Sequence, residues 1–110
     1  MNEITNTTGK DLYVYSFMAP KQDEWDWSYS YRTDWVKLAP GETVQFKYDR
    51  ISNYDGYTHG CIAMLEGTFG CSVFYKNDFS ASSWSEKKWC VDVKLKSNGK
   101  LDFTSQTKLL

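Results

Sequence analysis

Between residues 25 and 31, aromatic and polar side chains alternate without a break. The run reads Trp25-Asp26-Trp27-Ser28-Tyr29-Ser30-Tyr31. Successive side chains of a β-strand point to opposite faces, so a strand would place all four rings on one side. A helix would scatter the same rings around its circumference. We therefore expect a strand here, whose rings either cover a core or form a binding surface.

The rest of the chain is typical of a β-protein. No segment has a convincing helical period, and turn signals such as Pro40-Gly41 and Asn98-Gly99 recur at short intervals. The pattern favours an antiparallel sandwich or barrel, and we expect a single antiparallel β-sandwich of roughly eight or nine strands over residues 1–110. The expected strands are 3–6, 12–18, 25–31, 35–38, 43–49, 58–66, 71–76, 88–96 and 101–104.

Three segments allow firmer statements about burial. Residues 88–96 alternate between apolar and polar, which predicts a half-buried strand with Trp89 and Val91 facing inward. Residues 12–18 are apolar on both faces, so we expect a central strand that is covered on two sides. The tail 105–110 is expected to be frayed or to form an edge of the sheet.

Composition excludes several classes of protein. The net charge is −1 and the basic residues are spread along the chain, which argues against nucleic-acid binding. No apolar run approaches the roughly 20 residues of a transmembrane helix. The start of the chain lacks the basic and apolar pattern of a secretion signal. We expect a protein that is cytoplasmic or released without a conventional signal peptide.

No catalytic or metal-binding pattern stands out. The three cysteines lack the short paired spacing of a zinc site, and we expect buried, inert thiols; Cys61 and Cys71 flank a predicted hairpin turn, where a disulfide is the alternative. His59 is more simply explained as a structural residue than as a catalytic base. We expect a protein that is not an enzyme and that holds no cofactor or metal.

The remaining interpretation is ligand recognition. Aromatic residues form 17% of the chain, and they lie beside amide and carboxylate side chains in two predicted loops. Sugar binding uses this mixture, because a ring stacks on the sugar while polar groups bind its hydroxyls. The candidate ligand-binding residues are Asn53, Tyr54, Asp55, Tyr57, Asn77, Asp78, Trp84, Trp25 and Trp27.

Other interpretations of these aromatic residues stay open. Trp and Tyr rings, with Trp35 among them, would also suit the quaternary ammonium of a phosphocholine headgroup. They would equally suit a protein-interaction or inhibitor surface, or simply belong to the core. The expected partner is thus a glycan or a lipid headgroup, and homo-oligomerisation is left open.

Two short motifs resemble those of a known family. They are Ile4-x-Asn6-x-Thr8-Gly9, followed by Leu12, and Leu38-x-Pro40-Gly41-Glu42, followed by Phe46. In these residues and in its expected strand order the chain resembles the actinoporin and aegerolysin group of lectin-like, membrane-recognising β-sandwiches. The resemblance implies sugar or lipid-headgroup binding. The chain enters its first strand at once, so we do not extend the resemblance to pore formation by an N-terminal amphipathic helix.

Overall fold

The computed structural model describes residues 2–20, 31–46, 57–68, 70–76 and 87–109. Every element in these ranges is a β-strand. The strands are β1 (Asn2–Asn6), β2 (Leu12–Pro20), β3 (Tyr31–Arg32), β4 (Val36–Leu38), β5 (Thr43–Phe46), β6 (Tyr57–Leu65), β7 (Ser72–Lys76), β8 (Lys87–Leu95) and β9 (Leu101–Leu109). The expected all-β class is confirmed, although residues 25–30 of the aromatic stretch lie outside the described residues.

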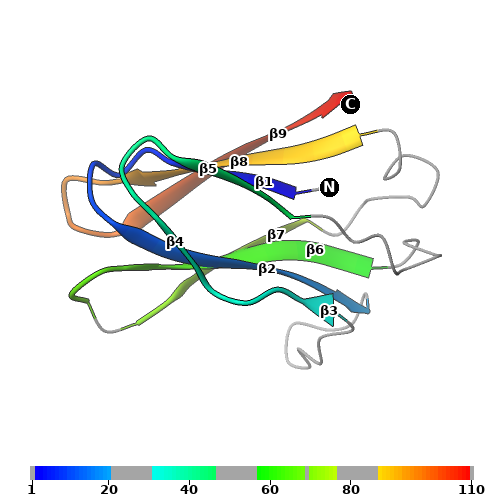
Figure 1. Cartoon of the computed structure of the whole chain (residues 1–110), viewed down its shortest axis with the longest axis horizontal. Helices are drawn as coiled ribbons and strands as arrows, with labels where there is room; N and C mark the ends of the chain where they lie inside the picture. Colours follow the sequence, from blue (N-terminus) through cyan, green and yellow to red (C-terminus); the bar gives the residue numbers. More distant parts are fainter. Residues whose placement is uncertain (1, 21–30, 47–56, 69, 77–86, 110) are drawn as a thin grey trace.

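The strands form two sheets, which lie in two layers (Figure 1). Sheet A has the order β5-β1-β8-β9. Sheet B has the order β3-β2-β6-β7, and β4 also pairs with β2. The central position expected for residues 12–18 is confirmed, because β2 pairs with β3 and β4 on one side and with β6 on the other.

One strand pair departs from the expected antiparallel arrangement. Strand β1 pairs with β8 in parallel, with Asn2 opposite Trp89 and Asn6 opposite Val93. The other described pairs are antiparallel. A parallel pair needs a long crossover connection. Here the connection is the whole chain between the end of β1 and the start of β8. Local turn chemistry carries no signal for such a pair.

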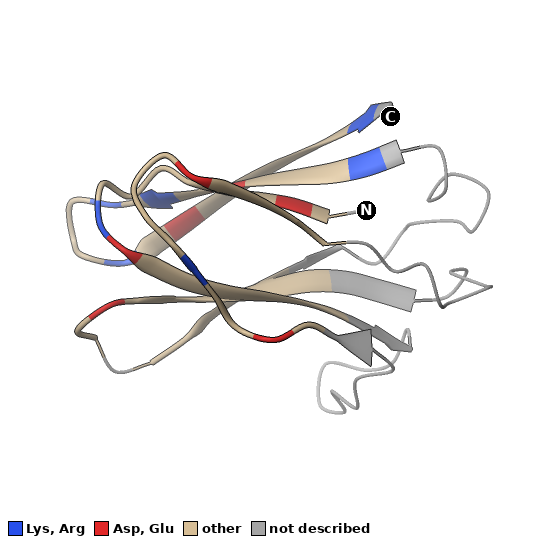
Figure 2. Ribbon diagram, in the orientation of Figure 1, with Lys and Arg blue, Asp and Glu red and all other residues tan. Residues whose placement is uncertain are grey.

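Charged residues are interspersed by sign over the described strands and turns (Figure 2). In the β8–β9 pair, for example, Lys94 lies opposite Asp102. No helix long and apolar enough to cross a bilayer occurs in the part of the chain that the structure describes.

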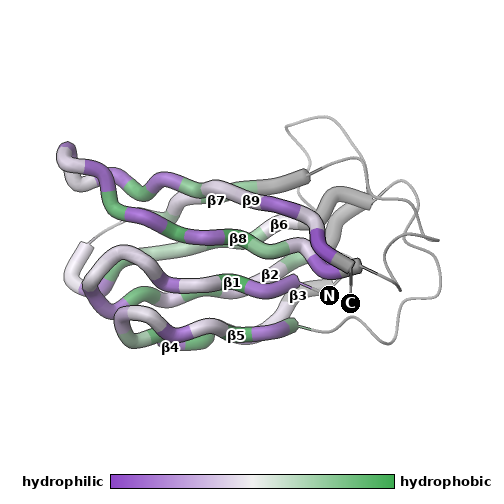
Figure 3. The backbone as a smooth tube through the Cα atoms, turned by 90° about the horizontal axis from the view of Figure 1, so that it is seen from above, coloured by the Kyte–Doolittle hydropathy of each residue, from purple (hydrophilic) through white to green (hydrophobic). Residues whose placement is uncertain are grey.

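The core lies between the two sheets and takes side chains from both. Sheet A contributes Ile4, Phe46, Trp89, Val91 and Val93, while sheet B contributes Leu12, Val14, Leu38, Cys61, Ala63 and Leu65. The ring of Phe74 in β7 stacks on Trp89 and Phe103 of the opposite sheet, with centroids 5.6 Å and 5.3 Å apart. The alternation of hydropathy along β8 is visible in Figure 3, and it confirms the predicted inward face of that strand.

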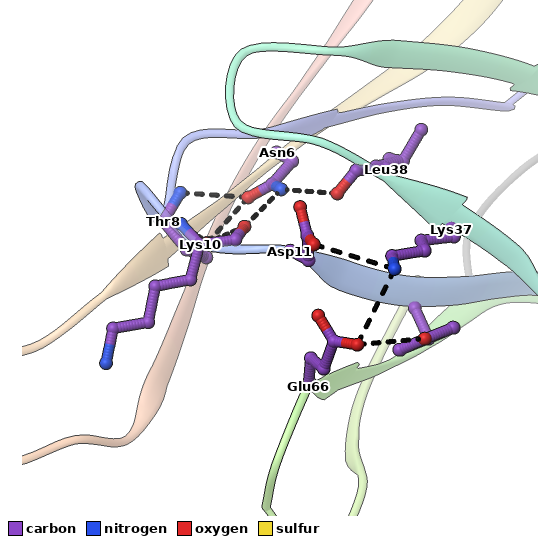
Figure 4. Close-up of polar contacts among 8 residues, drawn as sticks. Asn6, Thr8, Lys10, Asp11, Lys37, Leu38 and Glu66 are labelled. Atoms are coloured by element: carbon purple, nitrogen blue, oxygen red, sulfur yellow. Dashed lines mark hydrogen bonds and ion pairs between the residues drawn. The ribbon is translucent and has the colours of Figure 1, made fainter.

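Two buried polar residues of β1 link the layers. The amide of Asn2 donates a hydrogen bond of 2.5 Å to the Ser16 hydroxyl of sheet B. At the other end of β1, the amide of Asn6 donates to the carbonyls of Lys10 and Leu38, at 2.7 Å and 2.9 Å (Figure 4). Its side-chain oxygen accepts from the backbone N–H and the hydroxyl of Thr8.

Asn6 also joins the two motifs that carry the family resemblance. Its backbone N–H donates to the carbonyl of Glu42, and its carbonyl accepts from the N–H of Gly41. Gly41 has a positive φ of 85°, as the turn requires. The two motifs are therefore parts of one structural clamp.

Candidate functional site

The two ends of the β-sheets differ: one end carries the described turns, and the other carries both chain termini. The described turns after β1, β4, β6 and β8 lie at one end, which we call the turn end (Figure 1). Both termini lie at the opposite end, which we call the terminus end. The strand ends that border residues 21–30, 47–56 and 77–86 all belong to the terminus end. The strand pairing shows this, because each of these strand ends pairs with another residue at that end. The pairs are Pro20 with Tyr57, Met18 with Tyr31, Phe46 with Asn2, Lys76 with His59, and Lys87 with Leu109.

The predicted ligand-binding residues belong to these three segments or, for Tyr57, to a strand end beside one of them. Eight of them, Trp25, Trp27, Asn53, Tyr54, Asp55, Asn77, Asp78 and Trp84, lie outside the described residues. The ninth, Tyr57, is the first residue of β6. The topology thus attaches all three segments to one end of the molecule.

A second group of aromatic residues lies on the outer face of sheet B. Leu12 and Val14 of β2 point into the core, so the alternation of the strand places Tyr13, Tyr15 and Phe17 on the opposite face. Tyr15, Phe17 and Ile62 form a separate small cluster there. The prediction that both faces of this strand are covered is confirmed for these residues.

Trp35 extends this cluster toward solvent. Its ring meets the ring of Tyr15 edge-on, with centroids 4.6 Å apart and planes at 87°. Tyr15 is only 6% exposed, whereas Trp35 is 39% exposed. A buried ring therefore orients an indole that is still partly exposed to solvent. Trp89, in contrast, is fully buried.

A polar cluster lies next to these rings on the same face. The Lys37 ammonium is 3.6 Å from an Asp11 carboxylate oxygen and 3.5 Å from one of Glu66 (Figure 4). The Tyr13 hydroxyl donates to Glu66 at 3.5 Å, and Lys37 lies 5.7 Å from the centre of the Tyr13 ring. The pKa of Lys37 is raised, chiefly by the charge of Glu66. These exposed ion pairs add little stability because water screens them, so their groups are available to a ligand.

The rings and the polar cluster form one continuous surface. Tyr13 pairs with Lys37, and Tyr13 and Tyr15 are two residues apart on one face of β2, a spacing of about 7 Å. We call Tyr13, Tyr15, Trp35, Lys37 and Glu66, together with Asp11, the outer-face site. It combines an oriented indole, a phenol, two carboxylates and an ammonium.

Sequence reasoning assigned most of these residues elsewhere. From sequence, Trp35 belongs only to an alternative aromatic group, and Tyr13 and Tyr15 are expected to cover a central strand. Lys37 and Glu66 are not among the expected site residues. A usable signal is present in the alternation itself, because Trp35 and Lys37 alternate with apolar residues and therefore share one face of an expected strand. The carboxylates carried no signal, since Asp11 and Glu66 come from distant turns.

The outer face of sheet A holds a second polar group, around Glu3. Its carboxylate accepts hydrogen bonds from Gln45 at 3.0 Å, from the Cys90 thiol at 3.3 Å and from Lys88 at 3.5 Å. The hydrogen bond from Gln45 is the main cause of a lowered Glu3 pKa. Burial, with Glu3 nearby, raises the pKa of the Cys90 thiol. A protonated thiol that donates to a carboxylate is a poor nucleophile.

The other cysteines also differ from one another. Cys61 is fully buried, and burial raises its pKa to about 12. Cys71 is exposed, which corrects the expectation that all three thiols are buried. Cys61 lies opposite Phe74 in the hairpin, and Cys71 precedes β7, so the two do not face each other. All three are free thiols, and no cluster of three potential metal-ligating His, Cys, Asp or Glu side chains occurs within the described residues.

Comparison of the chain with models of known protein families, with curated proteins and with solved structures gives no match. We therefore infer function from the chemistry and geometry of the outer-face site and from the topology of the terminus end.

Proposed function

We propose that this protein is a lectin-like β-sandwich that binds carbohydrate without catalysis. The observation that carries the proposal is the exposed Trp35, held edge-on by the buried Tyr15 beside the Asp11–Lys37–Glu66 cluster. The ring offers a hydrophobic face to the C–H groups of a sugar. The carboxylates accept hydrogen bonds from sugar hydroxyls, and the ammonium donates to sugar oxygens.

The extent of the surface favours an oligosaccharide over a single sugar. Tyr15, which contacts Trp35, is five residues from Pro20 along β2, or roughly 17 Å at the usual rise of a strand. The segments that carry Trp25, Trp27, Asn53, Tyr54, Asp55, Asn77, Asp78 and Trp84 are attached at the Pro20 end. In this proposal Trp35 binds one part of the glycan, and the predicted residues, with Tyr57, bind another.

Electrostatics favours a neutral glycan over a cationic headgroup at the outer-face site. Lys37 already lies near the Tyr13 ring and would repel a quaternary ammonium. The same lysine is balanced by two carboxylates, so the site gives a neutral ligand polar partners of both kinds. The resemblance to the actinoporin and aegerolysin group remains consistent with this proposal as a sequence-based expectation.

A glycan array tests the proposal, using the wild-type protein, Trp35→Ala and Val73→Ala. Val73 is the matched control, because it is an exposed apolar residue on the same sheet but two strands away from Tyr15. We expect selective binding of oligosaccharides that Trp35→Ala weakens and Val73→Ala preserves. Sedimentation with sphingomyelin liposomes runs in parallel. Binding to liposomes without glycan binding, or capture of a stoichiometric protein partner with both ligands inert, would overturn the proposal.

A further inference from the structure

Strand β9 forms an edge of sheet A. Its described partner is β8, and the register between them runs without a bulge from Lys87 opposite Leu109 to Leu95 opposite Leu101. Figure 3 shows β9 at the border of the sheet. Residues 104–108 are exposed to solvent. A long, regular edge of this kind presents backbone N–H and C=O groups that can pair with another strand.

The sequence of β9 is self-complementary in charge. The strand reads Leu101-Asp102-Phe103-Thr104-Ser105-Gln106-Thr107-Lys108-Leu109, with one acid near its start and one base near its end. In an antiparallel pair of two copies centred on Ser105, Asp102 of each copy lies opposite Lys108 of the other. Both residues lie on the outer face of sheet A, because they pair with Lys94 and Lys88, which alternate with the core residues of β8.

The neighbouring registers do not have this property. With a two-fold axis perpendicular to the sheet, the outer face of one copy continues the outer face of the other. Residues that lie opposite each other must then point to the same face, so the axis passes between the two copies of one residue, and the next allowed registers are centred one residue away. Centring the pair on Thr104 brings Lys108 opposite Lys100, a like-charge pair. Centring it on Gln106 brings Lys108 opposite Thr104. Of these three registers, only the one centred on Ser105 pairs the opposite charges.

The surroundings of Lys108 within one protomer support this register. Lys108 lies directly opposite Lys88 in the β8–β9 pair, and like charges opposite each other are unfavourable. Lys88 is paired with Glu3 at 3.5 Å, whereas no ion pair between described residues includes Lys108. Asp102 lies 4.0 Å from Lys96 on an exposed contact. A second copy would supply Lys108 with a carboxylate, which none of the described residues of its own protomer places within ion-pair distance.

We propose that β9 pairs antiparallel with β9 of a second copy of this chain, centred on Ser105, to form a two-fold symmetric dimer. The two copies of sheet A then form one continuous sheet with the order β5-β1-β8-β9-β9-β8-β1-β5. The Asp102–Lys108 pair occurs twice and fixes the register, and the backbone hydrogen bonds of the edge are satisfied.

Charge-reversal variants test this dimer by sedimentation velocity. Lys108→Asp makes the edge acidic at both ends, and Asp102→Lys makes it basic at both ends. We expect the wild type to dimerise and each variant alone to dimerise at least about tenfold more weakly. An equimolar mixture of the two variants should restore a dimer, because the acidic edge then meets the basic edge.

Controls separate this effect from net charge and from folding. Lys100→Asp and Asp34→Lys make the same charge changes at exposed positions outside β9, and both should dimerise as the wild type does. Circular dichroism verifies that each variant is folded. A wild-type protein that stays monomeric at all concentrations, or folded variants that dimerise equally well alone and in the mixture, would overturn the proposal.

Discussion

The ring of Phe17 lies against Gly60 on the neighbouring strand, so closely that a β-carbon at residue 60 would fall 2.6 Å from the Phe17 Cε1 atom. The same β-carbon would lie 2.8 Å from the carbonyl oxygen of Phe74. Gly60 does not have a positive φ, so space rather than backbone conformation requires glycine here. The close approach leaves Phe17 fully buried on the outer side of sheet B.

Gly60→Ala should therefore destabilise the fold. We expect a loss of about 1–3 kcal/mol in the free energy of unfolding, as is usual when extra volume is forced into a packed site. Urea denaturation measures the loss. In a Phe17→Leu background the same substitution should cost less, because the smaller side chain relieves part of the overlap. Equal costs in both backgrounds would show that Phe17 and Gly60 are not coupled.

Asn6 offers a second test of stability. Asn6→Asp keeps an acceptor for Thr8 but removes the N–H groups that bind the carbonyls of Lys10 and Leu38. We expect a loss of about 2 kcal/mol or more, because a buried group that loses its partner costs about 1–3 kcal/mol. Thr8→Ser keeps the hydroxyl and should be nearly neutral. Urea denaturation compares the two, and an Asp variant as stable as the wild type would refute the clamp.

Much of the fold was readable from local patterns. The alternation of residues 88–96 predicted the burial of Trp89 and Val91, and Pro40-Gly41 and Asn98-Gly99 predicted turns that the structure contains. Patterns of this kind are visible in sequence because one strand or one turn determines them. The parallel pairing of β1 with β8 was not predictable in this way, since it depends on where distant segments meet.

The candidate site was less readable for a related reason. Tyr15 alternates with the core residue Val14, so the sequence indicates a strand covered on both sides and not an exposed aromatic surface. Asp11, Lys37 and Glu66 come from three separate segments and meet only in the folded chain. The nine residues proposed from sequence remain a prediction, because all but Tyr57 lie outside the described residues.

Glu3 should make the free energy of unfolding decrease as the pH falls into the acid range. Its pKa in the folded chain is below the ordinary value of 4.5, so it stabilises the fold above that value. This contribution is lost as the pH falls from about 4.5 through the lower native pKa. Glu3→Gln should therefore lose less stability than the wild type between neutral and strongly acid pH. Thermal unfolding at a series of pH values measures this, and parallel curves for the two proteins would contradict the role of Glu3.

Thiol reactivity should distinguish the three cysteines. Cys61 is sealed in the core with a pKa near 12, Cys90 is buried beside Glu3 and has a raised pKa, and Cys71 is exposed. At mildly alkaline pH we expect a thiol reagent to modify Cys71 rapidly and the other two only after unfolding. Mass spectrometry of the labelled peptides identifies the site. Rapid labelling of native Cys61 would mean that the core is open to solvent, contrary to this structure.

The most direct test of carbohydrate binding at the outer-face site is a fluorescence titration of Trp35→Ala and Trp35→Tyr against an oligosaccharide identified on the array. Trp35→Ala should weaken binding about tenfold, equivalent to about 1.4 kcal/mol, while Trp35→Tyr retains most of the affinity. Val73→Ala should bind as the wild type does. Equal affinity of the wild type and a folded Trp35→Ala protein would contradict the account.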